Sequence, residues 1–113
     1  MTPFTRSFKE TVVEQLRTDP AFRVAMVEET ARNFFRGDFR TALSQIRDVV
    51  DGTMEMEVLA DTTGIPLKEL VTILHERGNP DIVRFMVIVR GVCRHLGIRL
   101  SVRAEGVAPG DPG

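Results

Sequence analysis

The side chains that could do chemistry in this sequence are few, and they do not form a catalytic set. His75 and His95 lie twenty residues apart without a nearby cysteine pair, so they lack the ligand spacing of a zinc site. Cys93, the single cysteine, lies in an apolar run without a flanking base, which is typical of a buried thiol. We therefore expect no metal, no cofactor and no enzymatic activity.

Five side chains, His75 among them, could contact nucleic acid. Lys68, Thr72 and His75 carry hydrogen-bonding groups of the kinds that recognise base edges, and they fall on the exposed side of one short predicted helix. Arg77 and Asn79 follow that helix, and we expect them to contact the phosphate backbone. These residues would bind a ligand rather than catalyse a reaction, so their role depends on the helix that positions them.

Residues 56–75 have the pattern of a helix-turn-helix, within a unit that we assign to residues 53–78. Two short helices that cross closely need a small residue at the crossing and a turn residue that tolerates positive φ, and Ala60 and Gly64 meet these needs. A helical hairpin without a ligand is the alternative. The apolar residues expected to bury the pair are Leu59, Ile65, Leu70, Ile73 and Leu74.

The N-terminal part, residues 5–52, is predicted to form three helices. Apolar residues at helical spacing mark the first helix, which ends at Asp19, and the second begins at Pro20. Gly37 is suited to cap the end of the second helix, and Asp38 to cap the start of the third. The third helix has an apolar stripe ending at Gly52 and formed by Phe39, Ala42, Leu43, Ile46, Val49 and Val50.

Within the helix-turn-helix, Thr53 is the expected N-cap of the first helix, and the second is expected to run from Pro66 to about His75. After it, residues 82–96 are almost continuously apolar. Periodicity alone does not separate a helix from a strand in such a run, but its length favours a helix, against its β-branched residues.

Residues 98–103 alternate apolar and polar types, which is typical of a half-buried strand. A strand needs a partner, and the same strand of a second copy in a two-fold dimer is an economical one. Residues 80–103 would then be a C-terminal helix and strand, and residues 104–113, rich in glycine and proline, are predicted to be disordered. The expected fold is all-α, with five to six short helices, a helix-turn-helix and one short C-terminal strand.

Length and composition fit one packed domain, which we assign to residues 1–103 of the 113. The chain is 42% hydrophobic and 27% charged, which excludes the composition of a disordered protein. Its formal net charge of −1 excludes an extended basic surface, so any contact with nucleic acid must be local. One cysteine and the absence of a signal peptide or a long apolar segment predict a cytoplasmic protein without a membrane span.

Several segments together resemble the HigA-type antitoxins, addiction-module antidotes described as helix-turn-helix transcriptional regulators. The similarity covers nearly all of residues 8–102, and its most specific pieces are the GNP triplet at 78–80 and the GD…A…IRDVV stretch upstream. It implies a protein that binds and silences a RelE/HigB-like RNA-cleaving toxin encoded by the adjacent gene, and that represses its own operon. The segments are RTDPAF (17–22), FRGDFRTALSQIRDVVDGT (35–53), LADTTGIPLKEL (59–70), GNP (78–80) and LGIRLSV (96–102).

The exposed side of the second helix departs from the family's small polar and basic residues, because Leu67, Glu69 and Val71 also lie there. Apolar groups contribute to base recognition mainly against the thymine methyl, and an apolar pair one helical turn apart suits a protein contact at least as well. The alternative function is therefore a protein-interaction module of the same fold that has lost operator binding. A third possibility is that Leu67 and Val71 belong to the core and the helix phase is shifted by one residue.

Glu28 and Glu29 are the candidate toxin-binding residues, within a group of carboxylates on the first two helices. Charged residues on a helix usually form only its solvated side. An RNA-cleaving toxin is expected to carry a basic surface, however, and complementary charge would speed association with it.

Overall fold

The computed structural model describes residues 7–75 and 77–112, and these residues form an all-α fold. The predicted helical class and the helical form of residues 82–96 are confirmed. Residues 5 and 6 of the N-terminal part and Gly113 of the tail lie outside the described residues. The helices are α1 (Phe8–Thr18), α2 (Pro20–Phe35), α3 (Phe39–Thr53), α4 (Met56–Thr63), α5 (Leu67–Ile73) and α6 (Ile82–Leu96).

Short polar side chains start four of these helices. Asp19 accepts hydrogen bonds from the backbone N–H groups of Ala21 and Phe22, and Asp38 accepts one from that of Thr41. Ser7 and Asp81 cap α1 and α6 in the same way. These caps satisfy N–H groups that have no partner within the helix, so the sequence determines where each helix begins.

Gly37 ends α2 as expected. Its φ of 87° lies in the left-handed region, and its N–H donates to the carbonyl oxygen of Phe34. The N–H of Asp38 donates to the carbonyl oxygen of Asn33, which completes a Schellman motif. Asp38 therefore links the two helices, because it closes α2 with its backbone and opens α3 with its side chain.

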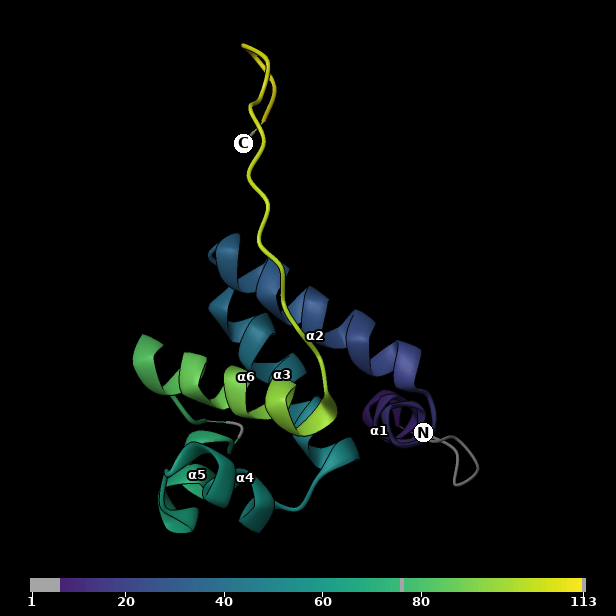
Figure 1. Ribbon diagram of the computed structural model, residues 1–113, viewed down its shortest axis with the longest axis vertical. Helices are drawn as coiled ribbons and strands as arrows, with labels where there is room; N and C mark the ends of the chain where they lie inside the picture. The colour runs from purple at the N-terminus through teal and green to yellow at the C-terminus, as the bar shows by residue number, and fades with distance from the viewer. Residues whose placement is uncertain (1–6, 76, 113) are drawn as a thin grey trace.

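The helices form two groups around one core (Figure 1). In the first, α2 and α3 pack side by side and α1 lies across them; in the second, α4 and α5 form the helix pair predicted to be a helix-turn-helix, and α6 contacts both α4 and α3. Phe85 of α6 stacks on Phe34 of α2 and meets Phe39 of α3 edge-on, at centroid distances of 5.1 and 4.9 Å. These rings connect α6 to α2 and α3, so α6 is one of the links between the pair α4–α5 and the first group.

Two predictions were wrong. Thr53 does not cap α4: it is the last residue of α3, and its hydroxyl donates to the carbonyl oxygen of Val49 one turn earlier. Glu55 takes the N-cap position of α4, without a capping hydrogen bond from its side chain.

The second wrong prediction is the strand at residues 98–103, because no strand occurs in the described part of the chain. Those residues pass across the C-terminal half of α2 (Figure 1), and the described part of the chain offers them no strand with which to pair.

Candidate nucleic-acid interface

The turn between α4 and α5 has the predicted geometry. Gly64 adopts a φ of 76°, which side chains rarely tolerate, and its N–H donates to the carbonyl oxygen of Ala60 at 2.9 Å. The hydroxyl of Thr63 donates to the carbonyl oxygen of Leu59 and accepts from the N–H of Ile65. All five apolar residues assigned to the core of this unit are buried, which confirms that prediction.

Gly91 of α6 makes the close approach on which the position of α4 depends. A Cβ atom at Gly91 would lie 2.7 Å from Cγ2 of Thr63 and 3.4 Å from Cδ1 of Leu59, so only a glycine fits there without movement. The sequence showed an isolated glycine inside an apolar helix. That signal points to a close backbone approach, but it does not identify the partner.

The exposed side of α5 carries Lys68 and Thr72, as expected, but the helix ends at Ile73 rather than near His75, so His75 is exposed two residues beyond it. The hydroxyl of Thr72 donates to the carbonyl oxygen of Lys68, which leaves its oxygen as an acceptor toward solvent. Nδ1 of His75 accepts from the N–H of Arg77 at 3.3 Å, so the Nε2 edge of the ring takes no part in that contact. Lys68 and Nε2 of His75 can therefore reach a ligand, whereas the hydroxyl proton of Thr72 is already used.

Leu67 and Val71 are also exposed on α5, with 40% and 52% of their surfaces accessible. The helix phase deduced from the sequence is therefore correct, and the alternative that both residues belong to the core is wrong. The apolar pair and the polar residues share one surface of a seven-residue helix. That surface has the chemistry for contacts with a thymine methyl or with a protein.

Glu69, the acidic residue of α5, is held by Arg84 of α6. Arg84 also binds Asp81 at 2.9 Å, and hydrogen bonding to Glu69 first, then to Asp81, raises the pKa of Arg84 above its usual value. Glu69 therefore shares a cation with Asp81. Because Arg84 offsets part of its negative charge, Glu69 repels an anionic ligand on α5 less than an unpaired carboxylate would.

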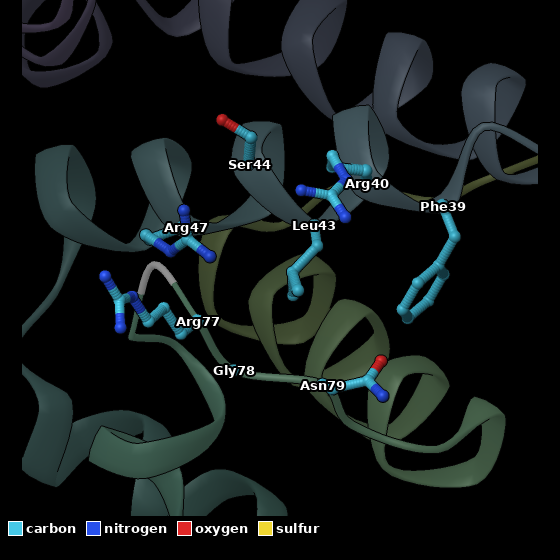
Figure 2. Close-up of a pocket in the computed structure, with 8 residues that line it drawn as sticks. All are labelled: Phe39, Arg40, Leu43, Ser44, Arg47, Arg77, Gly78 and Asn79. Carbon is cyan, nitrogen blue, oxygen red and sulfur yellow. The ribbon is translucent and has the colours of Figure 1, made fainter.

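Arg77 and Asn79 lie in a different environment from the residues of α5. With Gly78 they line one side of a cleft of about 620 Å³, and the other side is α3 (Figure 2). The residues that α3 contributes are Phe39, Arg40, Leu43, Ser44 and Arg47. The structure thus divides the five predicted contacts into two on α5, one just after its end, and two in this cleft.

The arginines of α3 are the functional candidates that sequence reasoning missed. Arg40, Ser44 and Arg47 recur at intervals of four and three residues, so they share one side of the helix. Nε of Arg47 donates to the carbonyl oxygen of Leu74 at 2.6 Å, and Nη2 donates to that of His75 at 2.9 Å. In the sequence, only the polar side of α3 pointed to these arginines. That pattern does not reveal that the loop after α5 lies opposite.

Glu28 and Glu29 lie on α2, away from both surfaces. Each carboxylate binds Arg32, at 2.7 and 2.6 Å, and hydrogen bonding to Glu28 first, then to Glu29, raises the pKa of Arg32 above its usual value. The two acids and one base leave a net charge of −1 at this site. The two carboxylates therefore form part of an ion-pair group rather than an uncompensated acidic patch.

Metal binding and covalent chemistry have no support among the described residues. No three His, Cys, Asp or Glu side chains in that part of the chain lie close enough to hold a metal ion. Cys93 is buried, as predicted, and its burial raises the pKa of the thiol, which disfavours the nucleophilic thiolate. None of the helices at residues 7–75 and 77–112 is long and apolar enough to cross a membrane.

No protein family, curated protein or solved structure was found to match this chain. A functional proposal therefore depends on the chain's own residues and on the resemblance described above.

Proposed function

We propose that this protein is a cytoplasmic DNA-binding antitoxin that neutralises a RelE/HigB-like RNA-cleaving toxin encoded by the adjacent gene and represses its own operon. One observation carries the proposal: α5 follows a tight Gly64 turn, buries Leu70, and exposes Lys68 and Thr72, with His75 exposed just beyond its end. In a helix-turn-helix, that exposed side of the second helix enters the major groove. The resemblance to HigA-type antitoxins supports the same function.

The proposal includes a homodimer. Two copies joined through α6 and residues 98–103 would present two α5 helices to one side of a DNA duplex, and the operator would be a palindrome with half-sites about 34 Å apart.

A band-shift titration with the chain's own upstream DNA at low salt tests operator binding. Lys68→Ala should weaken binding to this duplex more than to an unrelated duplex of the same length, because a base contact discriminates between sequences and a phosphate contact does not. Arg17→Ala, at an exposed position on α1, is the matched control for the loss of one positive charge. Equal affinity for the two duplexes would contradict operator recognition.

The exposed pair Leu67 and Val71 favours a second candidate, a protein-interaction module that no longer binds an operator. In that case no upstream duplex shifts at low salt. A small basic protein from the adjacent reading frame should still co-purify with the chain, and Leu67→Ser with Val71→Ser should weaken that complex. Retention of the complex by this double variant would count against the second candidate.

A further inference from the structure

The cleft between α3 and residues 77–79 is lined by three positively charged side chains. Arg40, Arg47 and Arg77 all line it, and no acidic residue lines it among residues 7–75 and 77–112. In Figure 2, Arg40 and Arg47 project from α3 on one side, Arg77 extends beside Arg47, and Asn79 lies on the opposite side. A chain of net charge −1 thus brings three guanidinium groups together at one site.

The guanidinium groups of Arg40 and Arg77 make none of the hydrogen bonds or ion pairs described above, whereas that of Arg47 uses part of its donors. Arg47 uses Nε and Nη2 on the carbonyl oxygens of Leu74 and His75, which fixes its side chain while Nη1 still carries donor capacity. Arg40 and Arg77 are exposed. The site therefore combines one oriented guanidinium with two that can adjust to a ligand.

The chemistry of the lining fits a phosphate group. Guanidinium groups bind phosphate oxygens through paired N–H donors, and the side chains of Ser44 and Asn79 add neutral donors. Leu43, which is buried, forms an apolar part of the lining that does not compete for the ligand. A cleft of about 620 Å³ that is open to solvent has room for a phosphate that remains part of a polymer.

The cleft also lies next to the end of α5. Leu74 and His75, the residues that follow α5, are bonded to Arg47, and Arg77 comes two residues later. A duplex held by α5 would have its sugar–phosphate backbone beside this point, because backbone contacts in helix-turn-helix complexes flank the recognition helix.

We propose that Arg40, Arg47 and Arg77, together with Ser44 and Asn79, form a phosphate-binding site that takes the phosphodiester backbone of duplex DNA beside the segment contacted by α5. This inference rests on the proposed DNA binding, and it adds α3 to the interface as the source of sequence-independent affinity.

The salt dependence of binding tests the proposal. The affinity of the full chain is measured for its upstream duplex and for an unrelated duplex of the same length, over a series of KCl concentrations. Arg40→Ala should lower the affinity for both duplexes by the same factor, and should reduce the slope of log K against log salt by about 0.9, the value for one phosphate contact. Arg40→Lys should keep the slope, because it keeps the charge.

Arg17→Ala is the matched control, and it should leave the slope unchanged. The proposal is overturned if Arg40→Ala leaves the slope of the wild type, or if it weakens only the upstream duplex. Tighter binding of single-stranded RNA than of either duplex would also overturn it. If both duplexes bind equally but Arg40→Ala still lowers the slope, operator recognition fails while the phosphate site stands.

Inorganic phosphate distinguishes a free anion from a polymer. It is titrated into the wild type and into Arg40→Ala, and the Nε–Hε resonances of the arginines are followed by NMR. Millimolar phosphate should shift the resonance of Arg47 in the wild type and much less in the variant. Phosphate binding without any duplex binding would assign the cleft to a free phosphate and overturn the DNA occupant.

Discussion

Arg47 of α3 and Leu74, the residue that follows α5, are joined by a hydrogen bond of 2.6 Å between Nε and the backbone carbonyl oxygen. The same guanidinium donates to the carbonyl oxygen of His75. Carbonyl groups at the end of a helix have no partner within it, and they carry the negative end of the helix dipole. With seven residues, α5 is too short to be stable by itself, so a cation from α3 helps to fix it.

Replacing Arg47 should therefore loosen α5 as well as lower overall stability. We expect Arg47→Met to reduce the free energy of unfolding by about 1.5–3 kcal/mol, the range for hydrogen bonds to a charged group. Arg47→Lys should recover only part of this, because an ammonium group lacks the fork that reaches two carbonyls. Urea unfolding gives the stability, and hydrogen exchange of the α5 amides gives the local effect. Uniform exchange across the molecule, without a larger effect in α5, would contradict this role.

Local features of the sequence were sufficient to predict most helix ends. The pairs Asp19-Pro20 and Gly37-Asp38 act through their own backbone and side chains, so no knowledge of the fold is needed to interpret them.

Thr53 shows where such local signals are not sufficient to predict a helix end. Its hydroxyl could have accepted from an N–H ahead of it, but it donates to the carbonyl oxygen of Val49 behind it. Both are local hydrogen bonds of threonine, and the sequence does not choose between them.

The candidate site was predictable only where a single element forms it. The exposed side of α5 follows from helical periodicity, so Lys68 and Thr72 were found. The cleft joins Arg40 and Arg47 to residues 77–79, about thirty positions later, and nothing local to α3 specifies that neighbour. The strand expected at residues 98–103 failed for a related reason, since a strand depends on a partner that the pattern cannot supply.

Gly91 gives a test of the packing between α6 and α4. We expect Gly91→Ala to destabilise the protein by about 1 kcal/mol, because overpacking against Thr63 exceeds the gain in helix propensity from alanine. Thr63 cannot rotate away easily, since its hydroxyl bonds to Leu59 and Ile65. Thr63→Ser removes the Cγ2 methyl group that a new Cβ would meet, and it keeps the hydroxyl.

The double variant with Gly91→Ala and Thr63→Ser should therefore recover the stability lost by Gly91→Ala alone, as measured by urea unfolding. Additive effects of the two substitutions would show that the methyl group of Thr63 is not the obstacle.

The capping carboxylates predict how stability depends on pH. Hydrogen bonds from Thr41 lower the pKa of Asp38 below its usual value of 3.8, and the backbone N–H of Arg84, with smaller contributions from its side chain, does the same for Asp81. Because the folded pKa lies below the unfolded one, each cap stabilises the fold fully above pH 3.8 and loses this contribution as the pH falls through the folded value.

We expect the double variant with Asp38→Asn and Asp81→Asn to show a flatter decline of unfolding midpoint below pH 4 than the wild type, and similar stability at pH 7, since asparagine also caps helices well. Asp111→Asn, in the exposed C-terminal segment, is the control and should follow the wild type. Parallel acid profiles for the double variant and the wild type would show that other carboxylates govern the decline.

The ion-pair group on α2 gives a test of toxin association. Reversing both acids, with Glu28→Lys and Glu29→Lys, changes the charge of the group with Arg32 from −1 to +3. If the toxin docks there with a basic surface, the on-rate should fall at least about tenfold at low ionic strength, and the difference should shrink as salt screens it. Stopped-flow mixing with the protein from the adjacent reading frame measures this rate.

The control is Glu57→Lys with Asp61→Lys, which makes the same change of net charge on exposed positions of α4. If both double variants slow association equally, the effect reflects net charge alone, and α2 is not the docking surface.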